Sequence, residues 1–354
     1  MGIVDRRDFL KLAGGTAAAA WSLPLLAQDK FQEVTDEQVK AIEKGLAWLA
    51  RSQSRSGAVG LTNQVAFTAL AGLAWLAGGS TPNRGKYASN LKDALRFILR
   101  CTPKSGYVNE TAGRGAGGSG MHGHGYALLF LAELYGMCGN LTDESIADDS
   151  VKEAVQRAVK CTEKAQDASG GWTYDPDPRG HEGSVTITQV EGLRAARNVG
   201  IAVSKATVDK GIAYIKKSTA PDGTIVYMAG NSGSGTYALT AAGACVYAMF
   251  GITDTAEAKR CIKAMLEFLQ GKRARTGGHD YYAHLYASQA CFFMKAHDST
   301  FWSEGYATLR KEILATQDKA TGAWLNDGYN GAFGTSCAML ALQIPYRCLP
   351  IFQD

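Results

Sequence analysis

The residues with the most reactive side chains lie in one short stretch near position 280. The segment GGHDYYAHLY, which starts at Gly277, contains His279, Asp280, Tyr282 and His284. Asp280 and His284 are four residues apart, so on a helix they project from the same face. Two metal ligands one helical turn apart are a common arrangement in metalloenzymes. We therefore expect Asp280, Tyr282 and His284 to be candidates for catalysis.

A second segment, GSGMHGHGY, adds two further histidines, His122 and His124. Zinc is usually held by three or four nitrogen, sulfur or oxygen ligands. The candidate ligand set is therefore His122, His124, His279, Asp280 and His284. Simpler alternatives remain open: Asp280 is also a favoured helix N-cap, His284 could be a hydrogen-bonded core residue, and His122 and His124 could bind loop backbone.

Other polar side chains occur just before two further expected helices. The segment YDPDPRGHEG contains Asp175, His181 and Glu182, and NDGYNG contains Asp327 and Tyr329. We expect all five on the rim of one cavity. Asp-Pro pairs favour turns, so the first segment is also compatible with a plain turn.

Six copies of one helical pair account for nearly all of the remaining sequence. In each copy an amphipathic helix is followed by a polar, glycine-containing stretch and then by a helix that is apolar on most faces. The second helices are expected at 64–78, 125–137, 185–200, 236–251, 281–294 and 334–346. A helix with one apolar face is typical of the protein surface. A helix that is apolar on all faces is typical of the buried interior. The pattern predicts an all-α fold, an (α/α)6 toroid spanning residues 28–354.

Closure of the six pairs into a ring is favoured over an open solenoid. The final segment, QIPYRCLPIF, is apolar, whereas an open solenoid needs polar caps at its ends. In a closed ring all inner helices run the same way, so their N-termini meet at one rim. Five of the six histidines precede or begin these helices. Helix N-termini also present free N–H groups, so this rim is suited to anions or a metal.

Three copies of the repeat share a glutamine, one or two glycines and, in two copies, a tryptophan. The residues are Gln53 and Gly57; Gln166, Gly170, Gly171 and Trp172; and Gln317, Gly322 and Trp324. They resemble the glutamine-tryptophan repeat of the terpene cyclases and the protein prenyltransferase β subunit. The resemblance implies an α/α toroid whose central cavity takes an apolar or isoprenoid-like ligand. It also implies zinc at the rim, because HDYYAHLYASQ resembles the prenyltransferase segment that supplies a histidine ligand.

Two motifs of these families are absent. The D-x-D-D acid motif of squalene and hopene cyclases does not occur, nor does the D-x-C-type segment that completes the prenyltransferase zinc site. Three functions therefore stay open: an exported, prenyltransferase- or cyclase-like toroid with a His/Asp-rich rim, a non-catalytic binding or scaffold toroid, and a carbohydrate-active toroid. The last would need paired carboxylates, from Asp175, Asp177, Glu182, Asp280 or Asp327.

Residues 1–27 have the features of a twin-arginine export signal. Arg6 and Arg7, followed by Phe9, Leu10 and Lys11, precede the apolar run LAGGTAAAAWSLPLL. We expect export to a periplasmic or extracytoplasmic location. No later segment is apolar over the roughly 20 residues that a membrane span needs. The net charge of +4, without any basic run, argues against a nucleic-acid partner.

Overall fold

The computed structural model describes residues 31–111, 119–139 and 141–353. The predicted export signal, residues 1–27, lies outside these ranges. In its described part, the unit formed by Glu33–Asp354 consists of helices joined by turns and loops, with isolated β-bridges but no named strand. Its outer helices are α2 (Asp36–Ser52), α4 (Ala88–Arg100), α6 (Asp148–Ala165), α8 (Lys205–Lys217), α10 (Ala256–Leu269) and α12 (Ala307–Ala315). Its inner helices are α3 (Gln64–Ala77), α5 (Gly120–Leu134), α7 (Gly183–Asn198), α9 (Tyr237–Met249), α11 (Asp280–Met294) and α13 (Ala332–Gln343). The described unit also contains the 3₁₀ helices η1 (Glu144–Ile146), η3 (Ile344–Tyr346) and η4 (Pro350–Phe352) and the π-helix η2 (Phe301–Tyr306).

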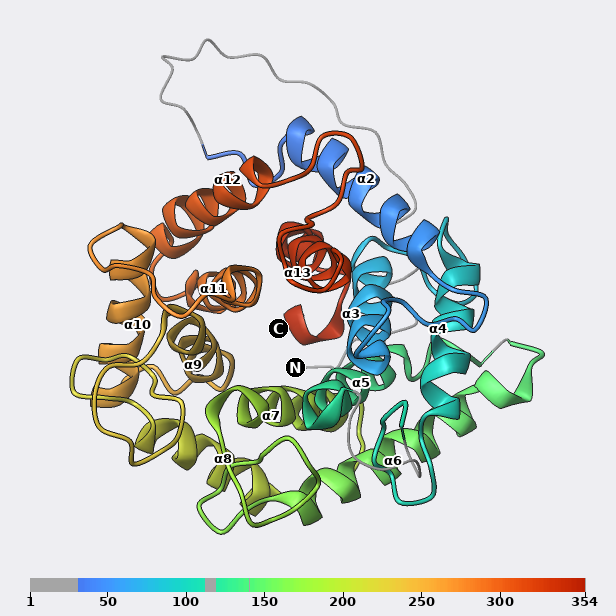
Figure 1. Cartoon of the computed structure of the whole chain (residues 1–354), viewed down its shortest axis with the longest axis horizontal. Coiled ribbons are helices and arrows are strands. Elements are labelled where there is room, and N and C mark those ends of the chain that lie inside the picture. Colours follow the sequence, from blue (N-terminus) through green and yellow to red (C-terminus); the bar gives the residue numbers. More distant parts are fainter. Residues whose placement is uncertain (1–30, 112–118, 140, 354) are drawn as a thin grey trace, which may run out of the picture. The chain divides into compact units, whose positions relative to one another are not determined.

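The prediction of an all-α, (α/α)6 toroid is confirmed. Figure 1 shows the inner helices as a ring surrounded by the outer helices. Each inner helix packs against the next, and α13 packs against α3, so the ring is closed. Gln343 of α13 reinforces this junction, because its Nε2 donates to the Ala74 carbonyl of α3 at 3.0 Å. Within the described ranges no helix is long and apolar enough to cross a bilayer.

The glutamine of the repeat ties its own turn to the next outer helix. Nε2 of Gln166 donates to the Gly170 carbonyl at 3.0 Å and to the Thr207 carbonyl of α8 at 2.9 Å. Gln53 makes the same pair of bonds, to Gly57 and to Asn90 of α4. Gln317 bonds Gly322 and, across the closure of the ring, the Ala41 carbonyl of α2 at 3.0 Å.

The glycine and tryptophan of the repeat fit the same turn. Gly170 has φ +97°, and a Cβ there would overlap the Lys210 carbonyl of α8, so both conformation and space require glycine. Trp172 is fully buried, and its Nε1 donates to the Thr162 carbonyl of α6 at 2.8 Å. The turn is therefore fixed between two outer helices, which explains why these residue types recur.

In the inner helices α3, α5, α7, α9 and α13, a side chain near the start of the helix accepts a backbone N–H from the preceding connection, whereas the Nδ1 of His284 in α11 has no such partner in the described structure. In four units this side chain is a threonine whose Oγ1 accepts a backbone N–H from the preceding turn. The pairs are Val59 with Thr68 (2.8 Å), Trp172 with Thr186 (3.0 Å), Ile225 with Thr240 (3.1 Å) and Trp324 with Thr335 (3.0 Å). In α5, His124 takes this place, because its Nδ1 accepts from the Val108 N–H at 3.1 Å. His284 occupies the corresponding position in α11.

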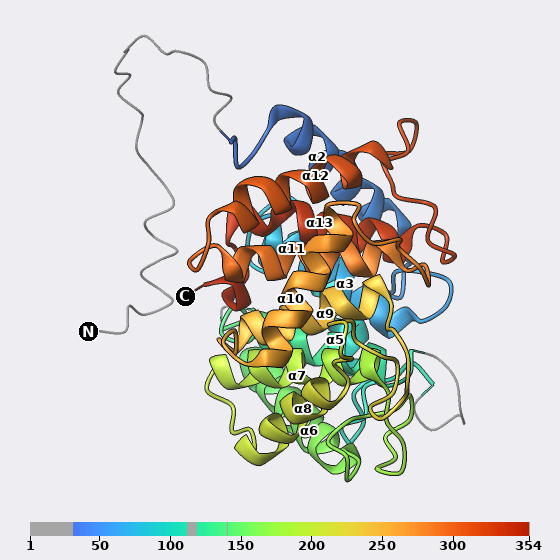
Figure 2. The same ribbon diagram turned by 90° about the vertical axis from the view of Figure 1, so that its left-hand side faces the viewer.

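The C-terminal segment closes the far rim of the ring. The turn η4 lies at the centre of the ring in Figure 1, and Figure 2 shows it on the side opposite the long connections. Arg194 of α7 donates to the Ile351 carbonyl at 3.2 Å. The ring of Phe352 packs 5.7 Å from that of Phe292 in α11. The interior is consequently accessible from the rim where the inner helices begin.

We expect Gln166→Ala to destabilise the fold, because it leaves two backbone carbonyls without their donor. The free energy of unfolding should fall by about 1–3 kcal/mol in denaturant titrations. Gln156→Ala is the matched control, because Gln156 lies on α6, the helix that Gln166 follows, and is exposed. Equal stability of the two variants would show that the glutamine does not hold adjacent units together.

Candidate functional site

A cavity of about 670 Å³ lies at the rim where the inner helices begin. Each inner helix contributes a residue to the cavity wall at a shared position. This position lies two residues before the Thr or His that faces the outer layer. These residues are Ala66, His122, Ser184, Ala238, Tyr282 and Phe333. Successive residues of an α-helix are about 100° apart, so two positions nearly reverse the direction of a side chain. The Thr/His position therefore faces the outer layer, and the position two residues earlier faces the ring axis.

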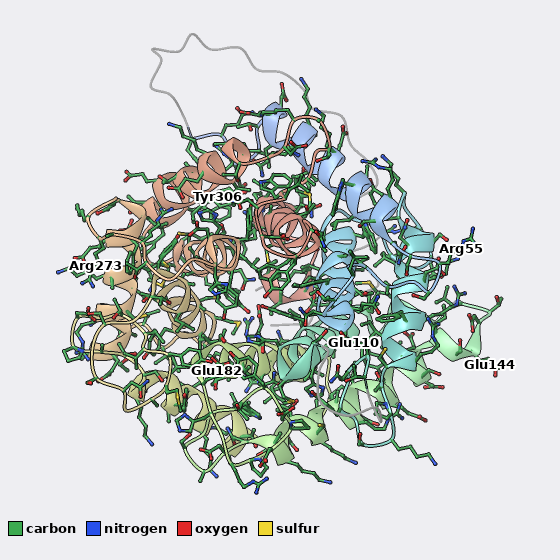
Figure 3. The ribbon with its side chains drawn as sticks, in the orientation of Figure 1. Arg55, Glu110, Glu144, Glu182, Arg273 and Tyr306 are labelled. Carbon is green, nitrogen blue, oxygen red and sulfur yellow. The ribbon has the colours of Figure 1, made fainter. Side chains whose placement is uncertain are left out.

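One wall of the cavity is polar and is formed by α5 and α7. His122 Nε2 lies 3.1 Å from Ser184 Oγ, and the Ser184 hydroxyl donates to Glu182 at 2.7 Å. Glu182 is buried and caps α7, where it accepts the Ser184 N–H at 2.8 Å. Burial raises the pKa of Glu182. Figure 3 shows Glu182 on the inner ring.

His122 is neutral at physiological pH. Removal from water disfavours its charged form, and repulsion from His279 acts in the same direction, so its pKa falls to about 4. Glu182 lies 3.9 Å away but does not reverse this shift. A neutral imidazole offers one donor and one acceptor, so His122 presents hydrogen-bonding capacity to the cavity without a charge.

The facing wall is aromatic and is formed by α3, α13 and the connection that precedes α13. The ring centroids of Phe67 and Tyr329 are 5.2 Å apart, and Phe333 lies 6.0 Å from Phe67 and 5.9 Å from Tyr329. These separations are typical of packed aromatic pairs. Together with Ala66 they give the cavity one extended apolar surface.

Two tyrosines stand at the mouth. The hydroxyls of Tyr174 and Tyr227 are 2.7 Å apart, and the residues are 47% and 45% exposed. Asp175 and His279 line the cavity beside them. His279 has φ +63° and makes no capping bond with its side chain. A positive φ is uncommon for a residue other than glycine, so the backbone of His279 is held in an unfavoured conformation at the mouth.

Some of the residues predicted for this rim line the cavity in the structure, and others lie away from it. The cavity wall includes His122, Asp175, His279, Tyr282 and Tyr329. Asp280 is exposed as the first residue of α11. His181 Nδ1 lies 2.9 Å from the Tyr214 hydroxyl. Asp327 caps α13, because it accepts the N–H groups of Gly331 and Gly334 at 3.0 and 2.7 Å.

His124 and His284 face the outer helices, which corrects the expectation that they join His122 at the cavity. The Nε2 of His124 lies 2.9 Å from the Thr162 hydroxyl of α6. The Nε2 of His284 lies 3.0 Å from a Glu312 oxygen of α12. The physical reason is register, because both histidines occupy the position that threonine fills in the other units.

The expected zinc ligands are consequently not brought together. Of the five candidates, only His122 and His279 line the cavity. Within the described residues no group of three or more His, Cys, Asp or Glu side chains is placed to hold a metal ion. Two imidazoles fall short of the three or four ligands that zinc usually takes.

Several site residues have no reactive motif and were missed in the sequence. They are Phe67, Tyr126, Tyr174, Ser184, Tyr227 and Phe333, all on the cavity wall. Alignment of the six inner helices on the Thr/His position would have found Ser184 and Phe333. Glu110 was also missed; it caps α3 by accepting the Gln64 N–H at 2.7 Å, and it lies on the inner ring in Figure 3.

Comparisons with known proteins identify the fold. No protein-family model matches the chain, and no curated protein matches it. Among solved structures it is similar to a glycosidase variant in complex with glucose (TM-score 0.59, 13% identity, 91% of this chain and 100% of the other). It is also similar to a type II terpene cyclase from Scytonema in complex with geranylgeranyl dihydroxybenzoate (0.58, 12%, 89% and 98%). A third is an alpha-amylase from Clostridium perfringens (0.56, 10%, 86% and 97%). At these identities the likeness concerns the toroid alone.

Glu312 should make stability depend on acid pH through its contact with His284. Arg275 also donates to Glu312 at 2.7 Å. The hydrogen bonds from these two side chains outweigh desolvation and lower the pKa of Glu312 from 4.5 to about 2. A depressed carboxyl pKa stabilises the fold above the unfolded value and loses this contribution as pH falls through the folded value.

We therefore expect Glu312→Gln to lower the melting temperature at neutral pH, with the difference from wild type shrinking between pH 4.5 and pH 2. The control is Glu153→Gln, which removes an exposed pair with Arg157 and should change little at any pH. A difference that persists unchanged at pH 2 would contradict this interpretation.

Proposed function

We propose that the toroid binds a neutral, amphiphilic small molecule of isoprenoid type in its cavity. The observation that carries this proposal is the division of the cavity into two walls. Phe67, Tyr329 and Phe333 form an apolar surface for the body of the ligand. His122 and Ser184 form a hydrogen-bonded pair for its polar end. A volume of about 670 Å³ is within the usual range for small-molecule sites.

The polar end of the ligand is uncharged in this proposal. The described part of the cavity wall contains no lysine or arginine, the residues that normally bind phosphate groups. His122 is neutral because its pKa is lowered to about 4. An alcohol or carbonyl oxygen therefore fits this wall better than a diphosphate. The Scytonema cyclase supports the ligand class, since the same kind of ring holds a geranylgeranyl compound there.

The carbohydrate alternative has weaker support from the site. Glycoside hydrolysis uses two carboxyl groups that flank the scissile bond. Among the described residues of the cavity wall, Asp175 is the single carboxylate. Glu182 lies close by, but it accepts the Ser184 hydroxyl and the Ser184 N–H. The two glycosidase-like neighbours share the fold, while the paired carboxylates are not found on this wall.

The binding proposal predicts a preference that ligand titrations can measure. Geranylgeraniol or farnesol should raise the melting temperature in a saturable way, whereas maltotriose should not. Phe333→Ser should weaken isoprenoid binding roughly tenfold or more, because a large aromatic contact is lost. Leu325→Ser is the control, because Leu325 lies in the connection that precedes α13 and is exposed outside the cavity wall. Stabilisation by maltotriose alone would overturn the proposal.

The polar wall predicts selectivity for the oxygen of the ligand. His122→Leu should weaken binding of geranylgeraniol several-fold and leave binding of the corresponding C20 hydrocarbon nearly unchanged, because only the alcohol loses a hydrogen bond. Calorimetric titration of both ligands measures the difference. Equal losses for the alcohol and the hydrocarbon would mean that His122 acts through packing alone.

A further inference from the structure

The carboxylate of Glu182 determines which hydrogens the polar wall of the cavity can offer. One of its oxygens accepts the Ser184 N–H at 2.8 Å, and the other accepts the N–H of Val185. The Ser184 hydroxyl also contacts this carboxylate, with Oγ 2.7 Å from one oxygen and 2.9 Å from the other. Three donors around one carboxyl group favour its ionised form, which accepts hydrogen bonds and donates none. The single hydrogen of the Ser184 hydroxyl is therefore donated to Glu182.

The tautomer of His122 follows from the direction of this bond. Its Nε2 lies 3.1 Å from Ser184 Oγ. Because the Ser184 hydrogen is already used, Nε2 must carry a hydrogen and donate it to this oxygen. The carboxylate favours the same arrangement, since Nε2 is 3.9 Å from a Glu182 oxygen. With its pKa lowered to about 4, His122 is neutral and has one N–H group, so Nδ1 keeps a lone pair and carries no hydrogen.

Nδ1 of His122 is the ring nitrogen that a ligand can reach. The side chain lines the cavity and is partly exposed. Within the described structure Nδ1 has no hydrogen-bond partner and is not enclosed. Ser184 also lines the cavity, and its oxygen retains one lone pair. The side chains of this pair therefore present acceptors to the cavity and no donor.

We propose that Glu182, acting through Ser184, holds His122 in the Nε2–H tautomer and thereby selects a ligand whose polar end is a hydroxyl group. The inference rests on the proposed function and narrows its ligand class. The hydroxyl of an alcohol can donate to Nδ1. An aldehyde, ketone or ether oxygen has no hydrogen to donate and would face two acceptors. Glu182 is thus a positioning residue, because it acts on the ligand through two other side chains.

Glu110 provides a matched control on α3. It caps this helix by accepting a backbone N–H at 2.7 Å, and it also accepts the Ser119 hydroxyl at 2.9 Å. The Ser119 oxygen then accepts the Ala66 N–H at 3.0 Å, so a backbone amide takes the place that His122 has in the other set of bonds. Glu182→Gln and Glu110→Gln alter the same kind of cap, and they differ in whether a histidine depends on it.

Nitrogen-15 NMR of the imidazole measures the tautomer without any ligand, and the His122 signals are those that His122→Leu removes. In wild type and in Glu110→Gln, Nε2 should carry the hydrogen. In Glu182→Gln the new amide can donate to Ser184, which frees the serine hydrogen for Nε2 and moves the His122 hydrogen to Nδ1. Ser184→Ala keeps the carboxylate cap of α7 and should also increase the fraction of His122 with its hydrogen on Nδ1.

Calorimetric titration then compares geranylgeraniol with geranylgeranial, the aldehyde of the same chain. Wild type and Glu110→Gln should bind the alcohol roughly fivefold more tightly than the aldehyde, as expected for one additional hydrogen bond. Glu182→Gln and Ser184→Ala should lose this preference while still binding both compounds. The two ligands share one hydrocarbon chain, so a general loss of stability in a variant would weaken both equally and leave the preference unchanged.

Four outcomes would overturn the inference. A hydrogen on Nδ1 of His122 in wild type would show that Glu182 does not hold the tautomer, whatever binds in the cavity. Equal affinity of wild type for alcohol and aldehyde would disprove the selectivity and leave the proposed function standing. A tautomer and a preference that survive both Glu182→Gln and Ser184→Ala would belong to another group. If neither compound binds wild type, the proposed function fails and the selectivity fails with it.

Discussion

The double hydrogen bond of the repeat glutamine joins neighbouring outer helices at three places in the described ring, including the junction that closes it. A primary amide nitrogen carries two hydrogens, and in Gln166 they go to carbonyls of two different elements, its own turn and helix α8. This geometry sets the offset between one outer helix and the next. In Gln317 the second carbonyl belongs to α2, so the last unit is held to the first by the same contact. A closed ring has no end to cap, which removes the need for polar terminal repeats.

In such a ring, the residues that line the cavity can change without altering the contacts that hold the helices together. The contact between an inner helix and its preceding turn is made by an outward-facing residue, such as Thr68 or His124, which accepts a backbone N–H. The residue two positions earlier lines the cavity instead. It is Ala66 on α3 and His122 on α5. Of the residues at this position, Ser184 bonds Glu182 in the preceding connection, whereas Ala66 and Ala238 have no polar side chain to do so.

The fold was predictable because its signals are local and repeated, whereas the orientation of the site residues was not. The outer helices have one apolar face, so their burial follows from periodicity. The inner helices are apolar on nearly every face, so periodicity does not say which face meets the axis. The spacing of Asp280 and His284 correctly predicts a shared helix but leaves open whether His284 faces the cavity or Glu312. That choice depends on which face of α11 packs against the outer helix α12, and the threonine positions of the other repeats reveal that face.

The C-terminal segment is bound to the inner helices at the rim opposite the cavity. Arg194 donates to the Ile351 carbonyl, and Glu133 accepts the Ile351 N–H at 3.4 Å, so both polar groups of one backbone residue are bound by the inner helices. Among the described residues, Tyr174 and Tyr227 are exposed at the opposite rim and line the cavity. In the proposed binding mode the polar end of the ligand lies beside His122, where hydrogen-bond capacity is available without the cost of burying a charge.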